Sequence, residues 1–218
     1  MNRRHFILTA ALGGIAGSWV DASALAASAS GKASVILVLG DSLSAEYGLK
    51  RGEGWVPLLQ KRLVEQKIAA TVINASISGD TTSGGRARLA SLLAQHKPTQ
   101  LVLELGANDA LRGLPLASTQ DNLLQITKTA QAAGAQVLIV GIQVPPNYGS
   151  DYTRRFGAIF ADVAAATKAA LVPFLLAGVA DAPDAATLFQ ADRIHPIAAA
   201  QPRLLDNVWP ALRKLLPR

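Results

Sequence analysis

Two short segments, far apart in the chain, carry residue types that could together attack an acyl bond. Ser42 lies in Gly-Asp-Ser-Leu-Ser (40–44), directly after the apolar run 35–39, and Asp192 precedes His195 by three residues near the C-terminus. A serine hydroxyl is a poor nucleophile at neutral pH, and the histidine that activates it works best when a carboxylate holds its second ring nitrogen. The pattern predicts Ser42 as nucleophile, His195 as base and Asp192 as the orienting acid.

His195 is the best candidate for the base among the three histidines of the chain. His5 lies in the leader, and His96 lies in a polar connection where a solvated histidine is ordinary. The spacing of Asp192 and His195 lets the carboxylate accept a hydrogen bond from the imidazole. Taken alone, this spacing is more typical of a helix N-cap with an incidental histidine, and it gains weight only from the serine motif.

Acyl hydrolysis also needs hydrogen-bond donors aimed at the developing oxyanion, each worth on the order of 100- to 1,000-fold in rate. The candidates are the backbone N–H groups of Ser42 and Gly79 and the side-chain amide of Asn108, which lies in Gly-Ala-Asn-Asp (106–109). Each has a plainer interpretation, with Gly79 as a turn residue and Asn108 as a helix cap or turn. Their joint occurrence after three apolar runs favours an oxyanion site.

Short apolar runs alternate with amphipathic stretches, which predicts strands alternating with helices. Near-continuous apolar strands separated by helices indicate a parallel sheet covered on both faces. We therefore expect an α/β protein with a three-layer, flavodoxin-like, doubly wound fold and a five-stranded parallel sheet, in which ligands bind at the carboxyl ends of the strands. The predicted strands are 35–39, 71–75, 101–105, 137–142 and 171–175, and the predicted helices are 55–64, 85–95, 118–133, 152–170 and 197–216.

The N-terminal residues have the features of an export signal. A basic stretch (1–5) precedes an apolar one (6–20), and Ala24-Leu25-Ala26 offers a cleavage site. We predict a signal peptide at 1–26, a linker at 27–33 and one catalytic domain at 34–218. Arg3-Arg4 also resembles a twin-arginine signal. We expect an exported protein, periplasmic or secreted, without stable membrane insertion, because no later run approaches the roughly 20 apolar residues of a span.

The composition argues against several kinds of site. The 218 residues include no cysteine, which excludes disulfides, a cysteine nucleophile and iron–sulfur clusters. One usable histidine makes a metal site of Asp80, Asp192 and His195 a poor prospect, so we expect no metal and no cofactor. The net charge is +6, but the basic residues are dispersed, which favours a solvated basic surface over a nucleic-acid site. Glu104, within an apolar strand, is either an edge residue or a paired buried acid.

In these motifs the chain resembles the SGNH (GDSL) hydrolases, and among them the bacterial thioesterase I, lysophospholipase and arylesterase group. The family order is kept through 40–44, Gly79 in 78–82, 106–109 and Asp192-x-x-His195-Pro196. The resemblance implies that Ser42 is the nucleophile, that His195 is the base and then the acid, and that Asp192 orients it. It also implies an oxyanion hole of Ser42, Gly79 and Asn108. Arg193 stands where many members carry glycine.

The loops after the third and fourth predicted strands, 110–116 and 144–149, are mostly apolar. Such a lining suits an acyl chain or an aryl ester better than a polysaccharide. We expect Leu111, Leu114, Pro145 and Tyr148 to bind substrate, and the resemblance implies that 111–116 moves when substrate binds.

We expect a monomeric serine esterase that hydrolyses acyl thioesters, lysophospholipids or simple aryl and alkyl esters through an acyl-enzyme. The same residues could serve a carbohydrate O-acetyl esterase, and acetylated sugars assayed beside medium-chain esters would separate the two. A non-catalytic binding module that keeps the motifs is the third interpretation, and a fluorophosphonate should leave such a module unlabelled.

Overall fold

A computed structural model describes residues 33–217 of the chain. The predicted signal peptide and all of the linker except Ala33 lie outside these residues. The five predicted strands form one parallel sheet in the order β2-β1-β3-β4-β5, which is the flavodoxin-like order and confirms the expected fold. The strands are β1 (Ser34–Gly40), β2 (Ala70–Asn74), β3 (Gln100–Glu104), β4 (Gln136–Val140) and β5 (Ala170–Val172).

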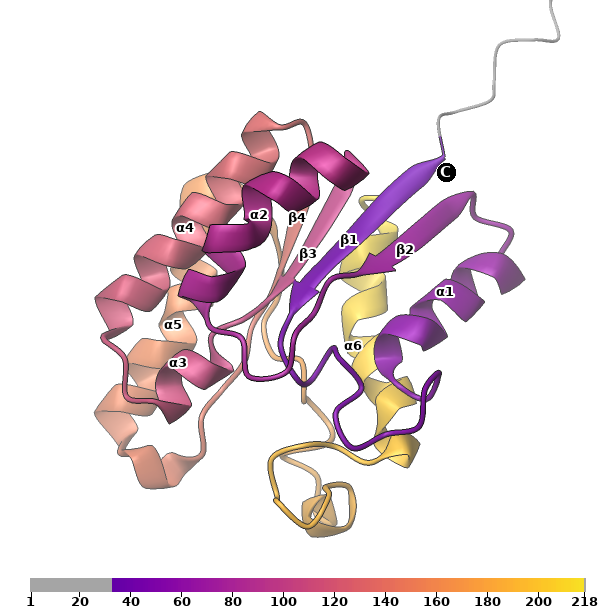
Figure 1. Ribbon diagram of the computed structural model, residues 1–218. Helices are drawn as coiled ribbons and strands as arrows, with labels where there is room; N and C mark the ends of the chain where they lie inside the picture. Colours follow the sequence, from indigo (N-terminus) through magenta and orange to yellow (C-terminus); the bar gives the residue numbers. More distant parts are fainter. Residues whose placement is uncertain (1–32, 218) are drawn as a thin grey trace, which may run out of the picture. The chain divides into compact units, whose positions relative to one another are not determined.

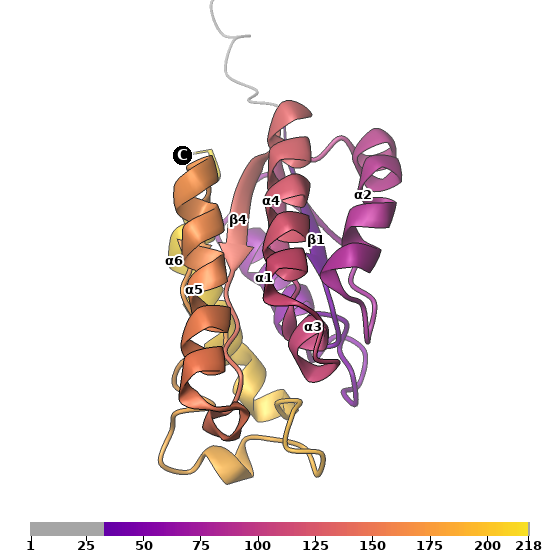
Figure 2. The ribbon, with the colours of Figure 1, turned by 90° about the vertical axis from the view of Figure 1, so that its left-hand side faces the viewer.

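Helices cover both faces of this sheet (Figures 1 and 2). Two of them, α1 and α6, pack on one face, and α2, α4 and α5 pack on the other. The helices are α1 (Trp55–Glu65), α2 (Thr82–His96), α3 (Ala107–Leu111), α4 (Leu116–Ala132), α5 (Ser150–Thr167) and α6 (Gln201–Arg213), with short 3-10 turns at η2 (Pro146–Tyr148), η3 (Ala185–Thr187) and η4 (Ala198–Ala200).

The sheet is the centre of the core because its middle strands are apolar on both faces. Leu37 of β1 lies beside Ile73 of β2 and Leu101 of β3, and both leucines are fully buried. The helices complete the core from each side. On α1, Trp55 and Leu59 are buried one turn apart, as a helix with one apolar face requires.

The observed elements differ from the predicted bounds by up to four residues. At their ends, β5 stops at Val172 rather than 175, α5 at Thr167 rather than 170, and α6 at Arg213 rather than 216. Helix α2 begins at Thr82 rather than at residue 85, because the hydroxyl of Thr81 accepts a hydrogen bond from the Gly84 N–H (3.2 Å) and caps it. The last helix begins at Gln201 rather than 197, with Pro202 in its first turn. Helix α3 was not predicted at all. Among residues 33–217, no helix combines the length and hydropathy needed to cross a membrane.

Candidate active site

The predicted nucleophile and oxyanion residues follow three neighbouring strands. Ser42 comes after β1, Gly79 after β2 and Asn108 after β3. Since β2, β1 and β3 are adjacent and parallel, these three connections leave the sheet at the same edge. The Ile77 N–H donates to the Gly40 carbonyl (3.1 Å) and ties the second connection to the first.

A tight turn presents Ser42 beyond the end of β1. The Asp41 carboxylate accepts the Leu43 N–H (3.0 Å), and the Asp41 carbonyl accepts the Ala45 N–H (2.9 Å). Gly40 is required where this turn leaves the strand, since a Cβ there would lie 2.8 Å from the Ser44 Cβ and 2.9 Å from a Glu104 oxygen. The turn leaves Ser42 partly exposed while Leu43 and Ser44 are buried.

His195 bridges Ser42 and Asp192. Its Nε2 lies 2.8 Å from Ser42 Oγ, and its Nδ1 lies 2.7 Å from Asp192 Oδ2. The second carboxylate oxygen of Asp192 accepts the backbone N–H groups of Ile194 (2.9 Å) and His195 (3.0 Å). Arg193, which lies between Asp192 and Ile194, has a φ of 57°, a left-handed conformation that suits glycine better.

The charge of Asp192 fixes the proton positions in this chain of contacts. Burial raises the pKa of Asp192, but the hydrogen bonds from the His195 ring and from the Ile194 and His195 N–H groups outweigh it and lower the pKa to about 2. An ionised carboxylate can only accept, so Nδ1 of a neutral His195 carries the proton. Nε2 is then the acceptor, and the Ser42 hydroxyl donates to it.

Two of the three predicted oxyanion donors are unoccupied. Among residues 33–217, neither the Ser42 N–H nor the Gly79 N–H donates to a protein acceptor. Gly79 has a φ of 80°, which glycine adopts without strain.

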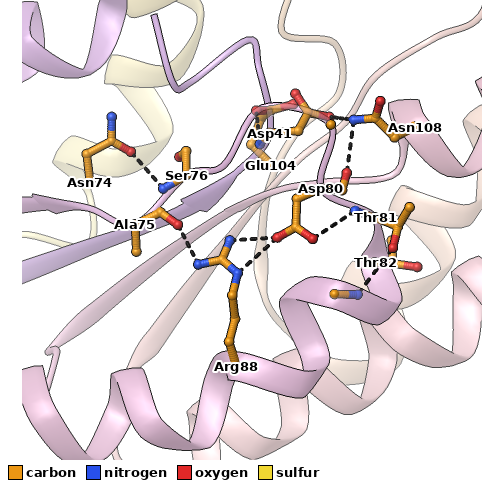
Figure 3. A network of polar contacts seen from close by, with 12 residues as sticks. Asp41, Asn74, Ala75, Ser76, Asp80, Thr81, Thr82, Arg88, Glu104 and Asn108 are labelled. Carbon is orange, nitrogen blue, oxygen red and sulfur yellow. Dashed lines mark hydrogen bonds and ion pairs between the residues drawn. The ribbon is translucent and has the colours of Figure 1, made fainter.

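Asn108 is different, because both hydrogens of its amide are engaged (Figure 3). Asn108 Nδ2 donates to the Asp80 carbonyl (2.9 Å) and to Asp41 Oδ2 (3.2 Å). The amide thus joins all three connections. To reach an oxyanion, Asn108 must give up or share one of these bonds, and the bond to Asp41 is the longer of the two.

The Gly79–Asp80 segment is anchored from α2. Arg88 donates to the Asp80 carboxylate from Nε (2.9 Å) and lies within 2.8 Å of it through Nη2, while its Nη1 donates to the Ala75 carbonyl (Figure 3). Arg88 and Asp80 are mostly buried, so solvent screens this pair less than an exposed one. A single arginine therefore holds both ends of the connection that carries Gly79.

Two acidic side chains, Asp41 and Glu104, are buried at the turn that carries Ser42. Glu104 lies on the central strand β3 and is 1% exposed, so it is a buried acid and not an edge residue. Its Oε2 accepts the Ser44 hydroxyl (2.7 Å) and the Asp41 N–H (3.4 Å). Burial, with the nearby Asp41 charge, raises the pKa of Glu104 well above its usual value. Burial likewise raises the pKa of Asp41 from 3.8 to about 7, although the Leu43 N–H and Asn108 oppose this rise.

The predicted substrate-binding residues are all exposed on the connections after β3 and β4. Leu111 ends α3, Leu114 lies between α3 and α4, and Pro145 and Tyr148 lie at the η2 turn. The 111–116 segment joins α3 to α4, and the Leu114 N–H donates back to the Asp109 carbonyl (2.9 Å). Within residues 33–217 no three His, Asp or Glu side chains gather as a metal site would require.

Two contacts at this site were not found from the sequence. The Tyr47 ring lies 4.3 Å from the His195 ring, centroid to centroid, and Arg112 donates from Nη2 to the Gly79 carbonyl (2.7 Å). Tyr47 follows Ser42 by five residues in an irregular turn, and Arg112 lies just after the unpredicted helix α3. Neither has a periodicity that would reveal its partner.

The model of the GDSL-like lipase/acylhydrolase family matches residues 38–201. Esterase TesA of Pseudomonas aeruginosa is 54% identical over 184 residues, which cover 84% of this chain and 90% of that protein. The crystal structure of TesA superposes with a TM-score of 0.80, over 84% of this chain and 99% of that one.

Two further relatives are similar over most of their length. An arylesterase of Vibrio mimicus is 42% identical over 83% of this chain and 89% of its own. The thioesterase 1/protease 1/lysophospholipase L1 of Escherichia coli K12 is 40% identical over 84% of this chain and 86% of its own.

Proposed function

The chain belongs to the GDSL-like lipase/acylhydrolase family, and on this premise we propose that it hydrolyses acyl esters and thioesters through Ser42. The relatives named arylesterase and thioesterase 1/protease 1/lysophospholipase L1 support a substrate class of aryl esters, thioesters and lysophospholipids. The observation that carries the proposal is the continuous contact from Asp192 through His195 to Ser42, with distances of 2.7 and 2.8 Å.

In the first half of the reaction, Ser42 Oγ attacks the carbonyl carbon while its proton passes to His195 Nε2. The Asp192 carboxylate accepts from Nδ1 and stabilises the imidazolium that forms. Negative charge develops on the carbonyl oxygen. The free N–H groups of Ser42 and Gly79 can stabilise this charge by donating hydrogen bonds to the oxygen. Asn108 adds a third donor when it releases Asp41.

Collapse of this intermediate expels the alcohol or thiol, which takes the proton from His195, and leaves Ser42 acylated. Water then gives a proton to His195 as it attacks the acyl-enzyme, and the second collapse passes that proton from His195 to Ser42 Oγ and releases the free acid. Leu111, Leu114, Pro145 and Tyr148 contribute the apolar surface that holds the acyl or aryl group.

The proposal includes export of the enzyme through the signal peptide at 1–26 and action as a monomer. Cell fractionation and N-terminal sequencing of the processed protein test the first point. Sedimentation of that protein tests the second.

The direct test is hydrolysis of p-nitrophenyl esters from acetate to palmitate by the wild type, Ser42→Ala and Ser91→Ala. Ser91 is an exposed serine on α2 and serves as the matched control. Ser42→Ala should lose at least about 10⁴-fold in kcat and all labelling by a fluorophosphonate, whereas Ser91→Ala should keep both. Undiminished turnover in Ser42→Ala would exclude the mechanism, and activity on acetate alone would favour a carbohydrate deacetylase.

A further inference from the structure

The segment that carries His195 is a closed loop, residues 188–197, which we call the base loop. The Gln190 N–H donates to the His195 carbonyl (2.8 Å), and the Ile197 N–H donates to the Leu188 carbonyl (2.9 Å). These bonds across the loop fix its own shape. They do not set where the loop stands relative to the serine turn, so that placement depends on other contacts.

One side chain of the base loop is hydrogen-bonded to the connection after β1 (41–54) at a point away from the catalytic contact. Gln190 Nε2 donates to the Tyr47 carbonyl (2.9 Å). Apart from the contact of His195 with Ser42, this is the one hydrogen bond between the two segments in the part of the chain that the structure describes. Gln190 is therefore the second link between the base and the nucleophile.

Tyr47, the acceptor of this bond, also contacts both catalytic residues. Its N–H donates to the Ser42 carbonyl (3.4 Å), and its ring lies 4.3 Å from the His195 ring, centroid to centroid. A path of hydrogen bonds therefore runs from the Ser42 backbone through Tyr47 and Gln190 to the His195 backbone. It connects the same two residues as the direct contact between Nε2 and Oγ.

The Gln190 amide has a defined place between the two segments. Its Nε2 also donates to the Pro196 carbonyl within the base loop (3.3 Å), so both amide hydrogens have acceptors. The connection after β1 leaves space for the amide, because a Cβ at Gly48 would lie 2.0 Å from Gln190 Oε1.

Loss of this amide should shift the base loop without releasing it. Pro196 is buried, and its carbonyl also accepts from Gln201 Nε2 (3.4 Å). Gln201 in turn accepts the Trp55 N–H (3.0 Å) at the start of α1. Proton transfer between Ser42 and His195 is sensitive to such a shift, since a misplacement of about 1 Å can cost about 100-fold in rate.

We propose that Gln190 is a positioning residue, which sets the distance between His195 Nε2 and Ser42 Oγ by tying the base loop to the Tyr47 carbonyl. The inference rests on the proposed hydrolysis through Ser42, because the rate of that reaction is its readout. Gln190 acts through His195 and takes no part in the chemistry itself.

The first test compares Gln190→Ala and Gln190→Met with the wild type in hydrolysis of p-nitrophenyl acetate. Methionine is close to glutamine in length but has no N–H donor, so both variants should lower kcat about tenfold and leave KM within about twofold. Labelling of Ser42 by a fluorophosphonate should slow by the same factor, since it also needs the base.

Gln131→Ala is the matched control. Gln131 is half-buried like Gln190, and its amide likewise donates to a distant carbonyl, that of Thr167 at the end of α5 (2.9 Å). This variant should keep the wild-type kcat and labelling rate. Thermal unfolding checks that every variant is folded at the assay temperature.

The second test asks whether Gln190 acts through His195. In a His195→Ala background the base is gone, so adding Gln190→Ala should change the residual rate by less than about twofold. A general weakening of the fold or a direct effect on the oxyanion site would lower that residual rate further.

Wild-type kcat in Gln190→Met would overturn the inference, as would a second loss of the same size in the His195→Ala background. Either result leaves the proposed hydrolysis standing as long as Ser42→Ala is inactive. Undiminished turnover in Ser42→Ala would instead reject that hydrolysis, and the inference with it.

Discussion

Arg112 Nη2 donates a hydrogen bond across 2.7 Å to the carbonyl oxygen of Gly79, the residue whose N–H is a proposed oxyanion donor. The carbonyl and the N–H of Gly79 belong to different peptide groups, so a bond to the carbonyl restrains the N–H through the backbone dihedrals of Gly79, whose φ is 80°. Arg112 holds the carbonyl from the connection after β3, the Asp80 N–H donates to the Ile77 carbonyl (3.0 Å) across the same turn, and Arg88 anchors the Asp80 carboxylate from α2.

Arg112→Ala should therefore lower kcat about tenfold while KM changes little. A misdirected donor loses its hydrogen bond to the oxyanion of the transition state, whereas binding of the uncharged ester depends on it less. Arg86→Ala is the control, since Arg86 is an exposed arginine that pairs with Asp121 on α4. Steady-state kinetics on a soluble ester separate the two constants. A rise in KM alone would assign Arg112 to substrate binding.

Tyr47 should support His195 through its ring and not through its hydroxyl, because the contact is between the two rings. We expect Tyr47→Phe to keep the wild-type kcat and Tyr47→Ala to lose about fivefold, a typical worth for one aromatic pair. Equal losses in both variants would shift the role to the hydroxyl group.

Asn108→Ala should lower kcat/KM by a factor that corresponds to about 3 kcal/mol of transition-state stabilisation. It should also lower the free energy of unfolding by about 1 kcal/mol, since the Asp80 carbonyl loses its donor. Asn122→Ala is a matched control, because the Asn122 amide donates to Thr82 away from Ser42. Wild-type kinetics in Asn108→Ala would remove the oxyanion role.

The buried acids Asp41 and Glu104 should make the protein less stable as the pH rises. Between 3.8 and about 7, the folded protein holds a proton on Asp41 that the unfolded chain has released, so the free energy of unfolding falls across this range. The raised pKa of Glu104 acts in the same direction.

Glu104→Gln removes one of these buried titratable groups, and Tm should then decline less steeply as the pH rises from 4.5 to about 7. Calorimetry over this range measures the slope. Glu65→Gln, at an exposed pair with Lys61, should leave the slope unchanged. A slope that stays the same in Glu104→Gln would mean that Glu104 is ionised in the folded protein.

The sheet could be predicted from the sequence because its strands are nearly pure apolar runs. All five were identified, and the structure begins each of them one residue earlier than predicted, at polar or small residues such as Ser34 and Gln100. These residues join the ladder through backbone bonds, which do not depend on side-chain polarity.

Helix α3 and the start of α2 escaped prediction for a different reason. At 107–111 only one turn and a half is present, too short for an apolar period to repeat. The start of α2 is stabilised by the Thr81 cap and by Asp109, which accepts the Thr82 N–H (2.9 Å) from another connection. Such a tertiary contact leaves no local signal.

For the site, the motifs identified the residues that the structure places in contact, Ser42 with His195 and His195 with Asp192. They could not reveal that Asn108 is already bound to Asp41 and Asp80, nor that a buried glutamate contacts the serine turn. These depend on how three connections pack against each other, and no spacing along the chain encodes that packing.

The carboxylate and the imidazole are held together locally, while the serine is not. Asp192 accepts hydrogen bonds from both the backbone N–H and the ring of His195, three residues along the chain. The contact from His195 to Ser42, in contrast, spans 153 positions of the chain. The segment that carries His195 is linked back to the serine turn by the Gln190 amide, which donates to the Tyr47 carbonyl (2.9 Å). Its detachment would separate base from nucleophile with the sheet intact, so activity should be lost on heating before the protein unfolds.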